Sequence, residues 1–134
     1  MSNAELFQKV KEMELPVGKY ALFGSAPMGI RNLKDCRDAD IIVTAEVWEK
    51  YSNDPAWRRQ KSASGNEGLA NGDIELWRSW NPWFPSVENL IAEAELIGGL
   101  PFVKLGRVLE WKKQYGREKD IKDVEIIENF LRTI

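Results

Sequence analysis

The sequence predicts a single α+β domain, in which a small β-sheet is flanked by helices and followed by a C-terminal helical segment. Short apolar runs separated by Gly and Pro fill the first 80 residues, an Asn-Gly pair joins two strand-like runs, and helical periodicity dominates after residue 86. A chain of 134 residues with 43% hydrophobic and 30% charged residues suits one folded domain. We expect this domain to span residues 1–134, with its core at about 19–80 and its C-terminal helices at about 86–134.

The first helix is predicted over residues 4–13, because its apolar residues recur at helical spacing. Ser2 and Glu5 have the spacing of a capping box at its start. Two short apolar runs bounded by turn residues then predict buried strands at 19–23 and 39–44.

A second helix is expected over residues 45–52, with Thr44 as its N-cap. Asn71-Gly72 lies between two short β-like runs, which is a strong signal for a hairpin. Three further strands are therefore expected, at residues 57–62, 66–70 and 73–77.

The remainder of the chain is predicted to be helical. One helix is expected over residues 87–97, capped by Ser86 and ended by Gly98-Gly99, and two more within 103–116 and 118–134. The last of these helices should bury a stripe made of Ile121, Val124, Ile126 or Ile127, and Leu131.

The composition limits the chemistry. The chain has no histidine, which excludes His-based acid–base catalysis, Ser-His or Cys-His nucleophile pairs and His metal sites. Cys36 is the single cysteine, so no disulfide forms within the chain and a reducing, cytoplasmic setting is expected. A net charge of −2 argues against bulk DNA binding, and no apolar run approaches the length of a membrane span, so no membrane partner is expected.

The loop after the first strand has features of a phosphate site. Gly24 allows close backbone approach, Ser25 with Pro27 suits the start of a helix, and Gly29 keeps the first turn uncluttered. Free N–H groups at a helix N-terminus favour bound phosphate. The spacing matches neither the Walker A loop nor the dinucleotide fingerprint.

Two acids mark the start of the second buried strand. Asp38 and Asp40 are two residues apart, so on a strand their side chains project from one face. Adjacent carboxylates repel one another unless a cation lies between them, and their oxygens suit Mg²⁺ carrying a nucleotide. Glu75, between two apolar residues of a neighbouring strand, is the expected third acid, and Asp73 is the fallback.

These residues resemble the signature of the nucleotidyltransferase superfamily, which includes DNA polymerase β-like enzymes and small bacterial toxin–antitoxin members. The signature positions are Gly24, Ser25, Gly29, Arg31, Asp38 and Asp40. Residues 100–127 are also similar to a segment of the toxin–antitoxin and abortive-infection branch, where an apolar helix with Lys leads to Arg-x-Lys-Asp-x-x-Asp. The resemblance covers about residues 20–131 and implies a nucleotidyltransferase-like mixed sheet flanked by helices.

The resemblance implies a Mg²⁺-dependent enzyme that transfers NMP from an NTP to an acceptor hydroxyl on a small molecule, a protein or RNA. Asp38 and Asp40 would bind two Mg²⁺ ions, or Mn²⁺, and Glu75 would complete this catalytic and metal site. The implied nucleotide-binding residues are Gly24, Ser25, Gly29, Arg31, Lys104 and Lys112. The alternative, motivated by the small size, is an inactive protein of the same fold that binds nucleotide or acts as an antitoxin-type partner of another protein.

Several roles stay open at the level of sequence. Arg31 either contacts phosphate or pairs with Asp35 four residues on. Lys104 and Lys112 lie on one predicted helix, and its rotation decides which of them faces the site. Both belong to a basic stretch at residues 104–122 that either attracts triphosphate or RNA or forms a solvated face.

The aromatic and acidic residues nearby also have two interpretations. Trp77, Trp80 and Trp83 lie together beside Glu75, where they either stack on a nucleobase or fill the core, and core packing is favoured. Asp120 and Asp123 either bind metal or cap and brace the last helix, and bracing is favoured.

Overall fold

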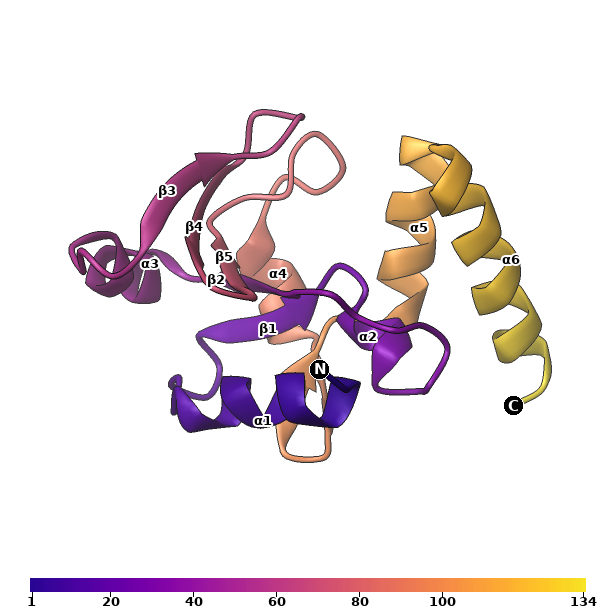
Figure 1. Ribbon diagram of the computed structural model, residues 1–134. Helices are drawn as coiled ribbons and strands as arrows, with labels where there is room; N and C mark the ends of the chain where they lie inside the picture. The colour runs from indigo at the N-terminus through magenta and orange to yellow at the C-terminus, as the bar shows by residue number, and fades with distance from the viewer.

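The computed structural model describes all 134 residues as a seven-stranded mixed sheet with helices on both faces (Figure 1). The prediction of an α+β fold with C-terminal helices is confirmed. The helices are α1 (Asn3–Glu12), α2 (Ala26–Gly29), α3 (Ala45–Ser52), α4 (Val87–Ala92), α5 (Leu105–Tyr115) and α6 (Glu118–Arg132). The strands are β1 (Tyr20–Phe23), β2 (Ala39–Val43), β3 (Arg58–Lys61), β4 (Glu67–Asn71), β5 (Ile74–Trp77), β6 (Glu95–Ile97) and β7 (Leu100–Phe102).

The strand order is β3-β4-β5-β2-β1-β7-β6. β2 is antiparallel to β1 and parallel to β5, whereas β7 is parallel to β1. β3 and β4, β4 and β5, and β6 and β7 are antiparallel pairs. This topology places the start of β2, with its two acids, beside the end of β1 and the start of β5.

Each face of the sheet is covered by its own hydrophobic core. Leu6 of α1 and Val47 of α3 pack with Ile41 on one face. Ile42 lies in the second core with Leu90 of α4, and α5 and α6 extend that core. Ile41 and Ile42 are fully buried on opposite faces, as the alternation along a strand requires.

The N-terminal half follows the sequence prediction closely. The hydroxyl of Ser2 accepts a hydrogen bond from the N–H of Glu5 at 3.1 Å, and the Glu5 carboxylate accepts from the N–H of Ser2, so the capping box is present. Thr44 occupies the N-cap of α3, but its hydroxyl makes no capping hydrogen bond. The predicted hairpin joins β4 to β5, with Asn71 paired to Ile74 around the turn.

The predicted helix over residues 87–97 is wrong in its second half. The helix α4 ends at Ala92, and the chain from Glu95 onward forms a hairpin of β6 and β7. Gly98 and Gly99 are the turn of that hairpin, with φ of +59° and +86°. Two consecutive residues with positive φ fit a tight β-turn, so this Gly-Gly pair connects strands and does not end a helix.

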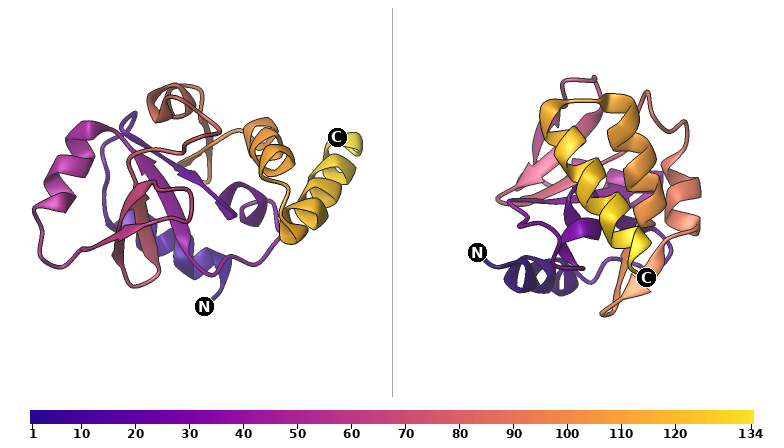
Figure 2. Two further views of the ribbon diagram at one scale, coloured as in Figure 1. Left: turned by 90° about the horizontal axis from the view of Figure 1, so that it is seen from above. Right: turned by 90° about the vertical axis from the view of Figure 1, so that its right-hand side faces the viewer.

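The predicted apolar stripe of the last helix is wrong for most of its members. Ile127 is fully buried, but Ile121 is 63% exposed and Ile126 and Leu131 are also exposed. The buried side of α6 carries Asp120 and Asp123 instead, because both carboxylates pair with cations. α5 and α6 pack side by side at one end of the molecule (Figure 2). None of the helices combines the length and the apolar character needed to cross a bilayer.

Candidate functional site

A cavity of about 500 Å³ is lined by residues at the end of β1, at the start of β2 and from the C-terminal helices. Four segments far apart in the sequence contribute to its wall: the loop after β1, the loop before β2, the β3–β4 loop and the aromatic loop after β5. The last turn of α5 and the start of α6 close the opposite side. Acidic, basic and aromatic side chains therefore meet in one hollow.

Two of the three predicted carboxylates form the acidic wall, and Glu75 lies outside the cavity lining. Asp38 and Asp40 both line the cavity. Asp40 is paired in register with Glu75 across the parallel strands β2 and β5, so both side chains lie on the same face of the sheet and a hydrogen bond links them. The indole Nε1 of Trp77 donates a second hydrogen bond to Oδ1 of Asp40 at 2.9 Å.

Burial and like charge act on these acids together. The pKa of Asp40 is raised to about 8, first by burial, then by its hydrogen bond to Glu75 and by the charges of Glu75 and Asp38, while Trp77 opposes the shift. The pKa of Asp38 is raised by desolvation and by Glu75, with Arg37 opposing. A bound cation would relieve this repulsion.

The carboxylates at this wall do not form a complete set of metal ligands by themselves. No group of three or more Asp, Glu, Cys or His side chains is arranged to hold a metal ion alone. Mg²⁺ commonly binds through one or two carboxylates and completes its shell with phosphate oxygens and water. Asp38 and Asp40 supply two carboxylates of the required kind. The fallback acid, Asp73, is held by an ion pair with Lys9 of α1 at 3.2 Å and does not line the cavity.

The Gly24-Ser25 loop borders the acids. Gly24 has φ of +61°, and a Cβ there would lie 3.1 Å from Cβ of Asp40, so only glycine fits between the loop and that carboxylate. Ser25 lines the cavity, but its hydroxyl caps nothing, and α2 has only four residues. A helix this short carries a small dipole, so the loop offers less to a phosphate than the sequence predicts.

Gly29 and Arg31 lie outside the cavity lining. A Cβ on Gly29 would collide with the thiol of Cys36, so this glycine permits close packing. Arg31 forms an ion pair with Glu95 of β6 and donates to the carbonyl of Pro27, and the pair with Asp35, one of its two predicted alternatives, does not form. Burial raises the pKa of the Cys36 thiol, so it stays a protonated, packed side chain.

The rotation of α5 separates the two candidate lysines. Lys104 is the exposed N-cap residue of α5 and lies outside the cavity lining, whereas Lys112, two turns later, lines the cavity and is only 3% exposed. Its ammonium lies 2.9 Å from Asp123 and 3.4 Å from Asp120 of α6.

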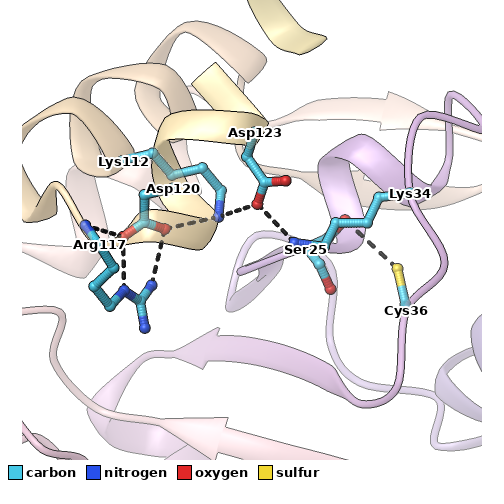
Figure 3. A network of polar contacts seen from close by, with 7 residues as sticks. All are labelled: Ser25, Lys34, Cys36, Lys112, Arg117, Asp120 and Asp123. Carbon is cyan, nitrogen blue, oxygen red and sulfur yellow. Dashed lines mark hydrogen bonds and ion pairs between the residues drawn. The ribbon is translucent and has the colours of Figure 1, made fainter. Parts of the chain in front are cut away.

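Lys112 belongs to a network of charges around two buried carboxylates, drawn in Figure 3. Lys34 lies in the loop before β2, and its ammonium is 2.6 Å from Oδ2 of Asp123. The guanidinium of Arg117 donates to the two carboxylate oxygens of Asp120 at 2.6 Å and 3.0 Å. Burial alone would raise the pKa of both carboxyls, but hydrogen bonds from their cationic partners lower it. Asp120 also accepts from the backbone N–H of Arg117, so its predicted capping role is confirmed, while Asp123 braces α6 through its ion pairs with Lys34 and Lys112.

Aromatic rings form the third wall. Trp77 and Trp80 line the cavity and are 8% exposed, and the Trp80 ring stacks on Phe23 of β1 at 4.5 Å between centroids. Trp83 packs against Tyr115 at 4.4 Å. The favoured interpretation, core packing, holds for the first two rings. All three also line the cavity.

Asn66 fixes the aromatic loop in place. Its side chain is 5% exposed, and its amide donates to the carbonyl of Asn81 at 2.8 Å. Its Oδ1 accepts from the hydroxyl of Ser79 at 2.8 Å and from the N–H of Asn81 at 2.9 Å. The β3–β4 loop thereby ties down the segment that carries Trp80.

Sequence reasoning missed Lys34, Arg117, Lys119 and Tyr115 as cavity residues. Arg117 and Lys119 lie in the basic stretch at residues 104–122, so the sequence did indicate that they could belong to a phosphate-binding site. The contact of Lys34 with Asp123 spans 89 residues, and nothing near Lys34 in the sequence indicates it.

The chain matches no protein-family model, and no curated protein is similar enough to be matched to it.

Proposed function

We propose that the chain is a minimal nucleotidyltransferase, which binds a Mg²⁺-bound NTP in the cavity and transfers NMP to an acceptor hydroxyl. The observation that carries the proposal is that one cavity holds paired carboxylates on one wall and a cluster of cations on the other. Asp38 and Asp40 line it at the start of β2, and the cations line it from the loop before β2 (Lys34), from α5 (Lys112) and from the residue before α6 (Arg117). A nucleotide with its metal is complementary to these charges, because the positive metal would face the carboxylates and the negative phosphates would face the cations.

Asp38 and Asp40 would hold the metal, which supplies charge stabilisation to the attacking and leaving oxygens of an in-line displacement. The acceptor oxygen forms a bond to the α-phosphorus while the bond to the oxygen bridging to the β-phosphorus breaks. Glu75, the in-register neighbour of Asp40 on β5, would take the proton of the acceptor hydroxyl. Pyrophosphate leaves on the side of the cations, which offset its charge.

The aromatic wall supports a nucleoside as the ligand. Trp77, Trp80, Trp83 and Trp111 all line the cavity, and base–aromatic stacking contributes about 1–3 kcal/mol per base. An inorganic anion alone would leave this wall unused.

Isothermal titration with the Mg²⁺ complex of each NTP tests the binding step. Asp38→Asn should lose binding at least tenfold, because a metal ligand becomes a neutral amide. Asp73→Asn is the matched control, since that acid lies outside the cavity and pairs with Lys9, and it should bind as wild type does. Equal affinity in the Asp38→Asn protein would reject the assigned site.

A second function, nucleotide binding without transfer as a sensor or antitoxin-type partner, is favoured by one observation. Asp40 is engaged by both Trp77 and Glu75, which competes with metal ligation. Pyrophosphate release from γ-labelled NTP, with small alcohols, protein and RNA as candidate acceptors, separates the two functions. Release that requires Asp38 supports transfer, and tight Mg²⁺–NTP binding with no release for any acceptor supports the sensor.

A further inference from the structure

Two lysines from distant parts of the chain share one carboxylate oxygen. Lys34 precedes β2, Lys112 lies in the last turns of α5, and their ammonium groups lie 2.6 Å and 2.9 Å from Oδ2 of Asp123 (Figure 3). The shared acceptor holds the two ammonium groups next to each other. Without it, two like charges would move apart.

The carboxylates lie behind the cations as seen from the cavity. Lys34 and Lys112 line the cavity, whereas Asp123 and Asp120 do not and are 4% and 0% exposed. Arg117 repeats the arrangement, since it lines the cavity, is held by Asp120 and lies 3.8 Å over the ring of Tyr115. Cations fixed in this way have already lost their rotamer freedom, which lowers the entropy cost of binding an anion.

The loop beside these lysines offers few backbone donors. Pro27 has no N–H, and the N–H groups of Met28 and Gly29 both donate to the carbonyl of Ser25. A phosphate group at this end of the cavity therefore depends on side-chain cations. Lys34 lines the same cavity as Ser25 and is 32% exposed at its side chain, so it can reach a ligand without leaving its site.

We propose that Lys34 and Lys112, positioned by Asp123, form the subsite that binds the terminal phosphates of the nucleoside triphosphate. The inference rests on the proposed function and deepens it. It makes Lys34 a phosphate-binding residue and Asp123 a positioning residue. It also predicts that the cavity selects triphosphates over monophosphates.

Inorganic tripolyphosphate, ATP and AMP are the probes, each titrated into the folded wild-type protein and its variants. Lys34→Gln should weaken binding of tripolyphosphate and ATP about tenfold or more, because charge-assisted hydrogen bonds are lost, and should change AMP affinity by less than about twofold. Lys34→Arg should largely restore binding. Lys113→Gln is the matched control, because Lys113 neighbours Lys112 on α5 but is exposed, pairs with Glu128 and lies outside the cavity.

The ratio of ATP to AMP affinity separates phosphate binding from a structural role. Asp123→Asn should lower this ratio, and circular dichroism shows whether that variant folds. If it does not fold, the Lys34→Gln and Lys34→Arg pair decides the question. An unchanged ratio in Lys34→Gln, or an equal loss of AMP and ATP binding, would overturn the subsite.

The outcomes also distinguish this subsite from the proposed function. Wild-type protein that binds tripolyphosphate through Lys34 but binds no Mg²⁺–NTP keeps the subsite and rejects the transferase. If wild-type protein binds Mg²⁺–ATP and the ratio of ATP to AMP affinity does not depend on Lys34, the subsite is rejected and the proposed transferase function is kept. Binding of neither probe rejects both.

Discussion

Replacing Gly24 by alanine measures how closely the loop after β1 must approach the carboxylates. An alanine Cβ would lie 3.1 Å from both Cβ and Cγ of Asp40 and nearer still to a carboxylate oxygen. Overpacking of this kind costs about 1–3 kcal/mol, and a positive φ adds about 1–2 kcal/mol for an L residue. We therefore expect Gly24→Ala to lower the free energy of unfolding by about 2–5 kcal/mol and to abolish stabilisation by Mg²⁺–ATP.

Gly98→Ala is the matched control. Its φ of +59° is close to the +61° of Gly24, but a Cβ there meets no atom within 4 Å, and the residue lies in the β6–β7 turn away from the cavity. It should cost only the backbone share, about 1–2 kcal/mol, and keep nucleotide binding. Urea unfolding followed by tryptophan fluorescence gives both values. Equal losses for the two variants, or unchanged Mg²⁺–ATP stabilisation in Gly24→Ala, would refute the close approach to Asp40.

Three further predictions concern the cavity and the charges behind it. Lys112→Met should cost about 3–5 kcal/mol in urea unfolding, because buried carboxylates lose a partner, whereas the exposed Lys113→Met should cost less than about 1 kcal/mol. Trp77→Phe should lower the free energy of unfolding by about 1–2 kcal/mol more than Trp80→Phe. Both rings are equally buried, but only Trp77 donates a hydrogen bond to a carboxylate, so equal losses would contradict this reasoning. Burial would raise the pKa of Asp123, but Lys34 and Lys112 hold this pKa below the ordinary 3.8. The ionised Asp123 therefore stabilises the fold above about pH 4, and this contribution is lost as the pH falls through the folded-state pKa. Acid unfolding of Asp123→Asn should therefore show a shallower pH dependence than wild type, and an identical slope would remove this carboxylate from the account.

The sequence predicts the sheet and most of its strands because their signals are local. Alternating or continuous apolar runs fix β1, β2 and β5, and Asn71-Gly72 fixes the hairpin between β4 and β5. The Gly98-Gly99 pair fails as a helix stop because the same residues suit a β-turn equally well. Only the pairing of β7 with β1, a long-range contact, decides between the two.

The acidic pair of the site is predictable from the sequence, whereas the basic half is predictable only for the residues of the stretch 104–122. The spacing of Asp38 and Asp40 on a strand places them on one face without any knowledge of the fold. Lys34 is held in place by its ion pair with Asp123 of α6. The apolar pattern of α6 predicts that the helix buries the side with Ile121, whereas the structure buries the side with Asp123. The buried ion pairs outweigh the apolar pattern of α6. Leaving a buried carboxylate without a cation costs more free energy than leaving an isoleucine exposed to solvent.

The most direct test of the central claim is thermal unfolding of wild type and Asp40→Asn with each NTP, in the presence and absence of Mg²⁺. A ligand at about 100 times its dissociation constant adds about 2.7 kcal/mol to the free energy of unfolding, which raises the melting temperature measurably. We predict that at least one NTP stabilises wild type, that this effect requires Mg²⁺, and that it is lost in Asp40→Asn. No shift with any nucleotide, or an equal shift in Asp40→Asn, would contradict a metal–nucleotide site on these carboxylates.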